Sequence, residues 1–371
     1  MVSIVKPIVL IIDKLSPPGG AQRLVVDDIN SFLEKGVHVQ LITLRKANAE
    51  TSLVSQCLLE KKYITDLHFR TLFDLHSWWM LLRIFHKLKP DVVVTHLWFS
   101  NVIGRIAAIL TRVKTIISFE HNVYDTVKSR RQFALDRFLA LRTTRIVAVS
   151  EAVAHSLARH GISGSRVTVL LNAINIKRFT EIDRNVIRNK FGISENEFIF
   201  LFAGRLTHQK GVDILLSAFK DVTQGTLYIV GDGEDRDKLH DLSKQIGIDS
   251  RVKFLGIRHD MPELYKITDV FVLPSRWEGL VIVMMEAMAS GLPIIASRID
   301  GMNELVEEGR NGILISPENI SELSEAMRTL LTDRSRRESM AYENLKDSKK
   351  FDIQSHSESL LHIINSEHSI P

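Results

Sequence analysis

Short runs rich in β-branched residues alternate with longer amphipathic stretches along most of this chain, and this alternation limits its fold more than any other feature. Ile8–Ile12 has the length and composition of a buried strand, and Ala21–Lys35 has the apolar spacing of a helix. Strands that alternate with helices form a parallel sheet with right-handed crossovers and helices on both faces. The pattern therefore predicts an α/β fold built from doubly wound sheets.

The alternation runs in two series, which a polar and irregular segment separates. We interpret residues 1–172 as a first domain, 173–197 as a linker and 198–350 as a second domain. Residues 351–371 have the apolar spacing of a further helix. Strands of the first series are expected at Ile8–Ile12, Val37–Leu44, Asp91–Thr95, Thr115–Phe119, Ile146–Val149 and Val167–Leu170. Those of the second are expected at Phe198–Ala203, Thr226–Val230, Val252–Leu255, Val270–Pro274, Ile294–Ser297 and Gly312–Ile315.

Composition excludes several other classes of protein. Of the 371 residues 45% are hydrophobic, which fills two cores and argues against disorder, collagen-like repeats and coiled coils. A single cysteine, Cys57, forms neither an intrachain disulfide nor a cysteine-based metal cage. No run approaches the ~20 apolar residues of a membrane-spanning helix, and the first residues lack a signal-peptide pattern. We therefore expect a cytoplasmic location.

Charge is distributed unevenly along the chain. Residues 1–172 carry 23 Lys and Arg against 13 Asp and Glu, a net charge of +10, whereas the remainder carries 25 against 31, a net charge of −6. A basic first half favours an anionic partner, such as nucleic acid, a membrane surface or a phosphorylated acceptor. Scattered solvated charge explains the same counts equally well.

A glycine-bounded turn, Gly204-Arg205-Leu206-Thr207-His208-Gln209-Lys210-Gly211, joins a predicted strand to a helix. Arg205 and Lys210 place two cations near the N-terminus of that helix, where the helix dipole also favours anions. A guanidinium fork and an ammonium charge together suit a diphosphate group. The alternative is that Lys210 is a solvated loop residue.

Two acids follow the strand that ends at Pro274. Glu278 lies at the start of the next predicted helix, and Glu286 lies about two turns further along it, among apolar residues. A carboxylate in apolar surroundings needs a partner. A pair of ligand hydroxyls can serve, because a carboxylate accepts two hydrogen bonds. A buried ion pair with an arginine or lysine is the alternative.

Two further glycine turns follow predicted strands, Val230-Gly231-Asp232-Gly233-Glu234 and Asp300-Gly301-Met302-Asn303-Glu304. Glycine at such a turn lets backbone amides approach a ligand closely. Neither turn contains Gly-x-Gly-x-x-Gly, which disfavours a dehydrogenase. Asp235-Arg236-Asp237 opens a helix, where acids are expected as partners of the dipole. We therefore predict no metal site and no cofactor.

In this order, the motifs resemble those of the retaining, nucleotide-sugar-dependent glycosyltransferases of family 4 (glycosyl transferases group 1), of the bacterial cell-surface polysaccharide type. The resemblance extends over nearly the whole chain, since it includes Gly19-Gly20-Ala21-Gln22-Arg23, Glu120-His121-Asn122 and Asn172-Ala173-Ile174-Asn175. It implies the GT-B fold, with two doubly wound Rossmann-like domains that face each other across a cleft and a C-terminal helix that returns to the first domain. Val281 stands where many members have proline, which should alter the rigidity of the loop more than its chemistry.

The resemblance also implies site residues. Arg205 and Lys210 would hold the donor diphosphate and stabilise charge on the departing nucleotide. Glu278 would bind a hydroxyl of the transferred sugar, and Glu286 would bind the ribose hydroxyls. His121 would face the donor sugar, with a structural histidine as the alternative. The donor site would further include Gly19, Gly20, Gly204, Gly231, Ile257, Arg258 and Leu280.

The substrates are expected by resemblance alone. The donor would be a UDP- or GDP-linked hexose or N-acetylhexosamine, with UDP favoured, and the acceptor a polyprenyl-diphosphate-linked saccharide of a surface glycan such as O-antigen or capsule. Lys128, Arg130 and Arg131 would lie on the acceptor side. A basic first domain would attract anionic lipid at the inner face of the plasma membrane, where Trp78 and Trp79 would sit among headgroups unless they pack into the core. Nucleic-acid binding is not expected.

Two other functions fit the same architecture. One is a non-hydrolysing UDP-sugar 2-epimerase, which would need additional acids and bases in the cleft. The other is a catalytically silent binding module, which would not need the two cations and two acids of the second domain. No residue stands out as a base for the acceptor, and in the family the leaving diphosphate is proposed to take that proton.

Overall fold

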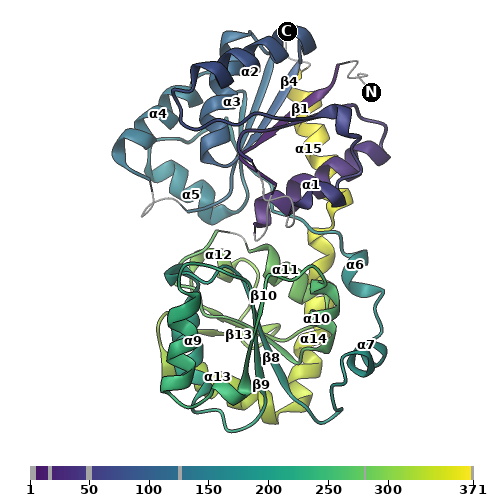
Figure 1. Ribbon diagram of the computed structural model, residues 1–371, viewed down its shortest axis with the longest axis vertical. Coiled ribbons are helices and arrows are strands. Elements are labelled where there is room, and N and C mark those ends of the chain that lie inside the picture. The colour runs from purple at the N-terminus through teal and green to yellow at the C-terminus, as the bar shows by residue number, and fades with distance from the viewer. Residues whose placement is uncertain (1–5, 16–18, 47–51, 124–127, 280, 369–371) are drawn as a thin grey trace. The chain divides into compact units, whose positions relative to one another are not determined.

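The computed structural model describes residues 6–15, 19–46, 52–123, 128–279 and 281–368 (Figure 1). The chain divides into two compact units, Met1–Asn172 with Ile353–Pro371, and Ala173–Asp352. The segment expected as a linker belongs to the second unit, where it forms α6 (Lys177–Thr180) and α7 (Arg184–Lys190). Each unit contains a parallel sheet with helices around it, so the expected pair of Rossmann-like domains is confirmed.

The described residues of the first unit form a seven-stranded sheet in the order β3-β2-β1-β4-β5-β6-β7, with all neighbours parallel. Its strands are β1 (Ile8–Ile12), β2 (Val39–Thr43), β3 (Ile64–Asp66), β4 (Val92–His96), β5 (Thr115–Glu120), β6 (Arg145–Ala148) and β7 (Val167–Val169). Every residue of β1, β2 and β4 is buried, as in a sheet covered on both faces. The direction of the connections reverses between β1 and β4, which makes this the topological switch point.

The helices of the first unit divide between the faces of its sheet. They are α1 (Gly20–Glu34), α2 (Leu75–Leu88), α3 (Trp98–Leu110), α4 (Arg130–Ala140), α5 (Glu151–Arg159) and α15 (Ile353–His368), with the short 3-10 helices η2 (Leu53–Gln56) and η3 (Lys61–Tyr63). Apolar residues of α2 and α3 share a core with strand residues such as Val9 and Ile11. The last helix, α15, packs against α1 and β5, where Ser357 Oγ donates to Asp28 Oδ1 at 3.0 Å (Figure 1).

The described residues of the second unit form a six-stranded parallel sheet in the order β10-β9-β8-β11-β12-β13. Its strands are β8 (Ile199–Ala203), β9 (Thr226–Val230), β10 (Val252–Gly256), β11 (Val270–Leu273), β12 (Ile294–Ser297) and β13 (Gly312–Ile315). The connections reverse between β8 and β11. The loops that leave these two neighbouring strands therefore meet at the switch point, where ligands of doubly wound sheets bind.

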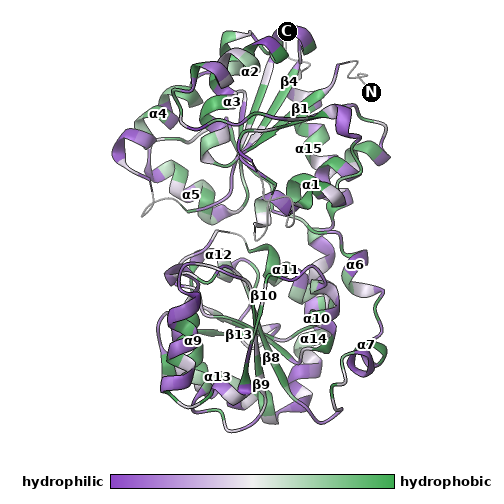
Figure 2. Cartoon of the chain, viewed as in Figure 1, coloured by the Kyte–Doolittle hydropathy of each residue, from purple (hydrophilic) through white to green (hydrophobic). Residues whose placement is uncertain are grey.

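The helices of the second unit include one that lacks a polar side. Besides α6 and α7 they are α8 (Val212–Phe219), α9 (Arg236–Gln245), α10 (Met261–Ile267), α11 (Ile282–Ala289), α12 (Asp300–Asn303), α13 (Ile320–Thr332) and α14 (Arg334–Ser348), with η4 (His208–Lys210), η5 (Asp249–Arg251) and η6 (Lys349–Phe351). All residues of α11 except Val283 are buried, and Figure 2 shows the helix as apolar, in contrast to the hydrophilic α9. Among the described residues, no helix combines the length and the apolar composition that crossing a membrane requires.

Polar side chains fix where several helices begin. Asp74 accepts a hydrogen bond from Ser77 N at 3.2 Å at the start of α2, and Ser150 accepts one from Val153 N at 3.1 Å at the start of α5. At the start of α4, Ser129 forms a reciprocal capping box with the residue three positions on. Each cap satisfies an amide that the helix itself leaves without an acceptor.

Candidate active site

The loops after β8 and β11 are tied together at the switch point of the second sheet. Arg276 N donates to Gln209 O at 2.8 Å, and Gln209 Nε2 donates to Trp277 O at 2.9 Å. The Arg276 guanidinium donates to His208 O at 2.6 Å and pairs with Asp213 at 2.8 Å. These bonds connect residues 63 to 68 positions apart, so they hold the two loops as one substructure.

Within that substructure, Lys210 and Glu278 form a buried ion pair. Lys210 Nζ donates to Glu278 Oε1, and the two side chains are 10% and 8% exposed. Gln209 Nε2 lies 3.4 Å from the other carboxylate oxygen. The alternative of a solvated Lys210 is therefore wrong. A buried charge needs compensation, and each member of this pair supplies it for the other.

Gly211 is required by the close approach of these loops. Its φ of 66° lies in the left-handed region, and a Cβ there would come within 2.1 Å of Pro274 O. Gly231 has a similar role, because a Cβ there would come within 1.9 Å of Gly204 O. Backbone packing thus explains why Gly231 is a glycine, whether or not Gly204 and Gly231 also border a ligand.

Glu286 lies on α11 and is 8% exposed. Its Oε2 accepts a hydrogen bond from the phenol of Tyr265 at 2.9 Å. Tyr265 is itself buried, and burial raises the pKa of its phenol well above the usual value, with the nearby Glu286 carboxylate as a further cause. A tyrosine hydroxyl is thus one partner of this acid, which the sequence did not reveal.

The remaining donor-side predictions lie in different surroundings. Arg205 is exposed, and its side chain makes no hydrogen bond or ion pair within the described part of the chain. Ile257 and Arg258 follow β10, where Arg258 Nε donates to Asp260 Oδ1 at 2.8 Å. Gly231 N donates to Gly256 O at 2.8 Å, which joins this loop to the one after β9. Leu280 lies outside the described residues.

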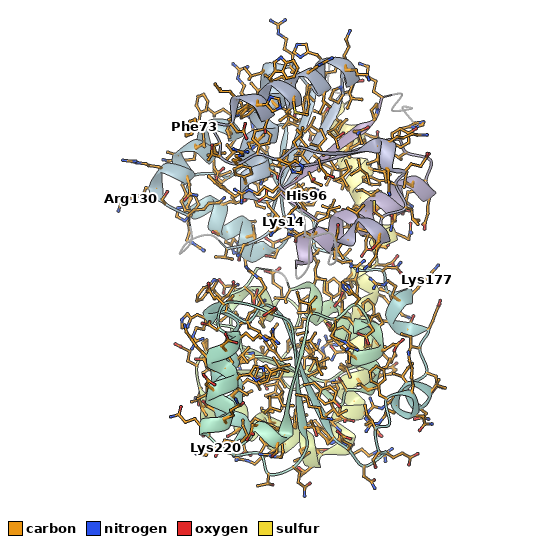
Figure 3. All side chains as sticks on the ribbon, in the orientation of Figure 1. Lys14, Phe73, His96, Arg130, Lys177 and Lys220 are labelled. Carbon is orange, nitrogen blue, oxygen red and sulfur yellow. The ribbon has the colours of Figure 1, made fainter. Side chains whose placement is uncertain are left out.

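In the first unit, His121 follows β5 and contacts a second histidine at the end of β4. His96 Nδ1 lies 3.1 Å from His121 Nε2, and both rings stack with Phe119. Burial lowers the pKa of His121 to about 3 and that of His96 well below its usual value. Both imidazoles are therefore neutral near pH 7, with His96 in the interior of the unit (Figure 3).

His96 is a residue that sequence reasoning missed. The expected strand stopped at Thr95, one residue short, although a histidine at the carboxyl end of a strand beside the switch point was a usable signal. Leu97 follows it with a φ of 73°, which is strained for a residue other than glycine. Gly19 and Gly20 lie at the N-terminus of α1, after β1, at the same switch point.

The acceptor-side predictions separate into a buried and an exposed group. Lys128 is wrong as an exposed cation, because its side chain is 3% exposed and pairs with Glu120 at 3.2 Å and Asp136 at 2.9 Å. Arg130 and Arg131, at the start of α4, are exposed, and Figure 3 shows Arg130 reaching away from the unit. Pairing with both Glu120 and Asp136 compensates the charge of Lys128 and so allows its burial.

The two tryptophans of α2 also separate. Trp78 packs edge to face on Phe69 with ring centroids 5.8 Å apart, and its Nε1 donates to Leu72 O at 2.8 Å. Trp79 is 57% exposed, beside Phe73 at 85% and Leu75 at 82%. Core packing is therefore the correct interpretation for Trp78 and the wrong one for Trp79.

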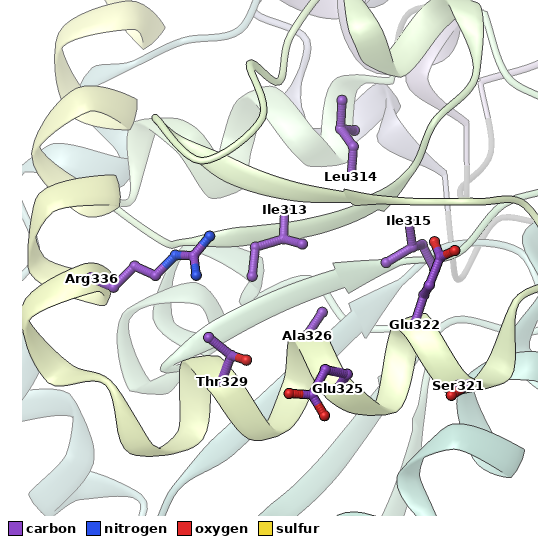
Figure 4. A pocket seen from close by; sticks show the side chains of 9 residues that line it. All are labelled: Ile313, Leu314, Ile315, Ser321, Glu322, Glu325, Ala326, Thr329 and Arg336. Carbon is purple, nitrogen blue, oxygen red and sulfur yellow. The ribbon is translucent and has the colours of Figure 1, made fainter.

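A shallow groove between β13 and α13 has a volume of about 400 Å³ (Figure 4). It is lined by Ile313, Leu314, Ile315, Ser321, Glu322, Glu325, Ala326, Thr329 and Arg336. None of the predicted site residues borders it, and β13 is an edge strand, separated from β11 at the switch point by β12. Among the described residues, no group of three or more His, Cys, Asp or Glu could hold a metal ion. The absence of a metal from the reaction stays a prediction.

Two family models match the chain, Glycosyltransferase Family 4 over residues 18–178 and Glycosyl transferases group 1 over residues 183–347. The UDP-Gal:alpha-D-GlcNAc-diphosphoundecaprenol alpha-1,3-galactosyltransferase of Escherichia coli is 30% identical over 70% of this chain and 71% of its own length. The capsular polysaccharide biosynthesis glycosyltransferase CapM of Staphylococcus aureus is 27% identical over 83% of this chain and 87% of its own length.

Solved structures share the fold. The crystal structure of Anabaena HepE in complex with UDP-glucose is 25% identical and superposes with a TM-score of 0.84, covering 96% of this chain and 99% of that one. Since both family models match in sequence order and a 30% identical relative is covered over more than two thirds of its length, the chain belongs to the family 4 glycosyltransferases and has their GT-B fold.

Proposed function

We propose that this glycosyltransferase moves a hexose or N-acetylhexosamine from a UDP-sugar to a lipid-linked saccharide, with retention of the anomeric configuration, in the biosynthesis of a bacterial surface glycan. The observation that carries the proposal is the Lys210–Glu278 pair at the switch point of the second sheet. Named relatives support the substrates. The E. coli relative is named for UDP-Gal and a diphosphoundecaprenol-linked acceptor, and the S. aureus relative for capsular polysaccharide.

Donor binding would exchange partners within the ion pair. A diphosphate that reaches Lys210 would replace Glu278 as the compensating anion, and the freed carboxylate would accept hydrogen bonds from a sugar hydroxyl. Arg205 is exposed and pairs with no acid among the residues that the structure describes, so it can turn towards the same diphosphate. Glu286 would accept hydrogen bonds from the ribose hydroxyls.

The reaction then needs little from acids and bases of the protein. The bond between the anomeric carbon and the diphosphate oxygen breaks while the acceptor oxygen bonds to the same face of the sugar. The acceptor proton passes to the leaving diphosphate oxygen, and Lys210 and Arg205 stabilise the charge that builds there. His121 is neutral near pH 7 because its pKa is about 3, so it suits a hydrogen bond to a sugar hydroxyl.

The acceptor would be met at a membrane surface by the first unit. Phe73, just before α2, and Leu75 and Trp79, one turn apart on it, are exposed apolar side chains, and Arg83 is positioned over the Trp79 ring at 5.3 Å. An amphipathic face with cations at its border suits the headgroup region of anionic lipid. We therefore propose peripheral contact through α2 at the inner face of the plasma membrane.

The decisive experiment measures nucleotide binding by thermal shift with UDP, GDP, ADP and their sugars. A ligand at 100 times its dissociation constant stabilises the protein by about 2.7 kcal/mol. Glu286→Ala should abolish the response to the preferred nucleotide, and Lys210→Ala should weaken it strongly. Variants that respond like the parent would disprove the site.

Transfer is tested with undecaprenyl-diphosphate-linked N-acetylglucosamine as acceptor. Incorporation of the sugar as the same anomer as in the donor supports the proposal. Conversion of the UDP-sugar to its 2-epimer without an acceptor would instead establish an isomerase. Nucleotide binding with neither reaction would establish a binding module.

A further inference from the structure

Tyr265 on α10 is buried, yet its hydroxyl lies at a predicted binding residue. The phenol oxygen lies 2.9 Å from Glu286 Oε2 and 3.1 Å from the backbone oxygen of Val283. Both acceptors belong to α11, one turn apart. A single hydroxyl donates one proton, so the carboxylate and the carbonyl share it. The phenol thereby ties the Glu286 carboxylate to the backbone of its own helix.

The ring of Tyr265 is held on two other sides. Phe179 of α6 packs edge to face on it, and Phe271 of β11 lies at a tilt, each with ring centroids 5.9 Å away. Tyr265 is 0% exposed. A phenol fixed by two aromatic neighbours is a rigid support, because buried rings leave no room for another rotamer.

Glu286 has the opposite character when considered alone. Its side chain has three rotatable bonds, and fixing such a side chain on binding costs affinity. It also lies on a helix whose other described residues are apolar and offer no side-chain donors. Tyr265, on the neighbouring helix α10, therefore supplies a side-chain hydrogen-bond donor to the Glu286 carboxylate that α11 itself lacks.

We propose that Tyr265 is a positioning residue, whose phenol holds the Glu286 carboxylate in the orientation that receives the two vicinal hydroxyls of the donor's ribose. The inference rests on the proposed function, in which Glu286 binds that ribose. It adds that the preference for a ribonucleotide is set by a pair of residues from adjacent helices. The competing explanation is a hydrogen bond that only stabilises the fold.

The test compares binding of UDP and of 2′,3′-dideoxy-UDP by isothermal calorimetry, in the parent and in Tyr265→Phe. The substitution removes one oxygen and keeps the ring. We expect UDP to bind about tenfold more weakly to the variant, which corresponds to about 1.4 kcal/mol. For 2′,3′-dideoxy-UDP we expect less than a twofold difference, because the carboxylate has no ribose hydroxyls to receive. In steady-state assays, KM for the donor should rise more than kcat falls.

Tyr228→Phe is the matched control. Tyr228 is also buried in the second unit, but its hydroxyl accepts a hydrogen bond from Lys253 Nζ at 3.1 Å and contacts no predicted site residue among those described. The Tyr228→Phe variant should bind both nucleotides with parental affinity. Phe179→Leu is a second variant that keeps the phenol and loosens its support. It should produce a smaller loss with the same dependence on the ribose hydroxyls, and it decides the question if Tyr265→Phe does not fold.

The outcomes separate this inference from the proposed function. Equal weakening of both nucleotides, or unchanged binding of UDP to Tyr265→Phe while Glu286→Ala is impaired, overturns the positioning role and leaves the proposed function intact. If Glu286→Ala itself binds UDP like the parent, or the parent binds no UDP, the proposed function has failed. An effect of Tyr265→Phe that persists in the Glu286→Ala background also overturns the inference.

Discussion

Each unit buries one lysine beside a glutamate that lies at or just after the end of a strand, but the two lysines have different surroundings. In the first unit, Lys128 contacts Glu120 and Asp136, and Arg105 pairs with Asp136 at 2.8 Å, so two cations and two acids meet among the described residues. In the second unit, Lys210 has Glu278 as its described acidic partner. The side chains of the first group are at most 3% exposed, and those of the second are about 10%.

The comparison shows that a buried lysine can have either of two roles: to stabilise the fold or to bind a ligand. The first network extends beyond the charged groups, since Asn101 Nδ2 also donates to Glu120 at 3.0 Å and Arg105 Nε donates to Asn101 O at 2.8 Å. It fastens α3, α4 and β5 together. The Lys210–Glu278 pair lies on glycine-containing loops at a switch point and retains slight solvent access, so a ligand can compete for either member.

The largest expected effect is on stability, from Lys128→Met. Removing this cation leaves Glu120 and Asp136 buried with too little compensation, which should lower the free energy of unfolding by about 3–5 kcal/mol. Tryptophan fluorescence during urea unfolding measures it, since Trp78, Trp79 and Trp98 lie in the first unit. UDP affinity of the folded variant should stay parental. A stability change below about 1 kcal/mol would mean that the network is not a structural unit.

Lys210→Met should show the reverse profile. Loss of a cation that stabilises developing charge reduces the rate of sugar transfer by about 10²–10³-fold, or about 2.7–4 kcal/mol. The Glu278 side chain retains 8% exposure, so water can solvate its carboxylate in the variant, and stability should change less than in Lys128→Met. Lys220→Ala, at an exposed lysine of the same unit, is the control and should transfer at the parental rate. If Lys210→Met unfolds as readily as Lys128→Met, the contrast between the two lysines does not hold.

A smaller effect concerns pH and the neutral histidines of the first unit. The pKa values of His96 and His121 lie below 6.5 in the folded state, so the unfolded chain takes up protons first as pH falls. Their contribution to stability is present above pH 6.5 and is lost below it, by at most about 1.4 kcal/mol per pH unit for each proton. His356, whose pKa Asp28 raises, contributes with the opposite sign, so its stabilisation is lost as pH rises through that pKa.

Urea unfolding between pH 7.5 and pH 5 tests this slope. His121→Asn should flatten it, because the variant lacks the imidazole whose pKa is lowered in the folded state. A parental slope in His121→Asn would show that this imidazole titrates alike in both states.

The smallest expected effect distinguishes exposed cations from the buried one beside them. Arg130→Ala with Arg131→Ala should reduce binding to vesicles that contain phosphatidylserine by about 1 kcal/mol per arginine, with stability unchanged. Sedimentation with vesicles measures it, and neutral phosphatidylcholine vesicles are the control. Equal binding of the parent and the double variant would mean that these two arginines do not contact anionic lipid.

The sequence predicted the parallel sheets well, because strands buried on both faces are written as uninterrupted β-branched runs. It missed β3, whose residues are half-buried or exposed and lie at a sheet edge. It also missed α14, a helix of high polarity in which Met340 is the buried apolar residue. Periodicity is weak where one or two residues carry the contact with the core.

The sequence predicted which residues make up the candidate site, but it did not predict which side chains they contact. Glycine turns after strands pointed to Lys210 and Glu278, but their mutual pairing depends on strand order, since β8 and β11 are neighbours only after the crossover. Nothing in the sequence distinguished Arg276, which connects the two loops. Nothing in the sequence distinguished Tyr265 either, because a buried tyrosine gives the same pattern whatever its hydroxyl contacts.

The position of α15 has a consequence for how the molecule is made. This helix supplies Leu360 and Ile364, both fully buried, and His356, whose Nδ1 lies 2.8 Å from Leu171 O. A ribosome synthesises these residues only after the entire second unit. The first unit must therefore wait in an incomplete form, with the side of α1 and β5 that α15 covers still open to chaperones, while its neighbour is already able to fold.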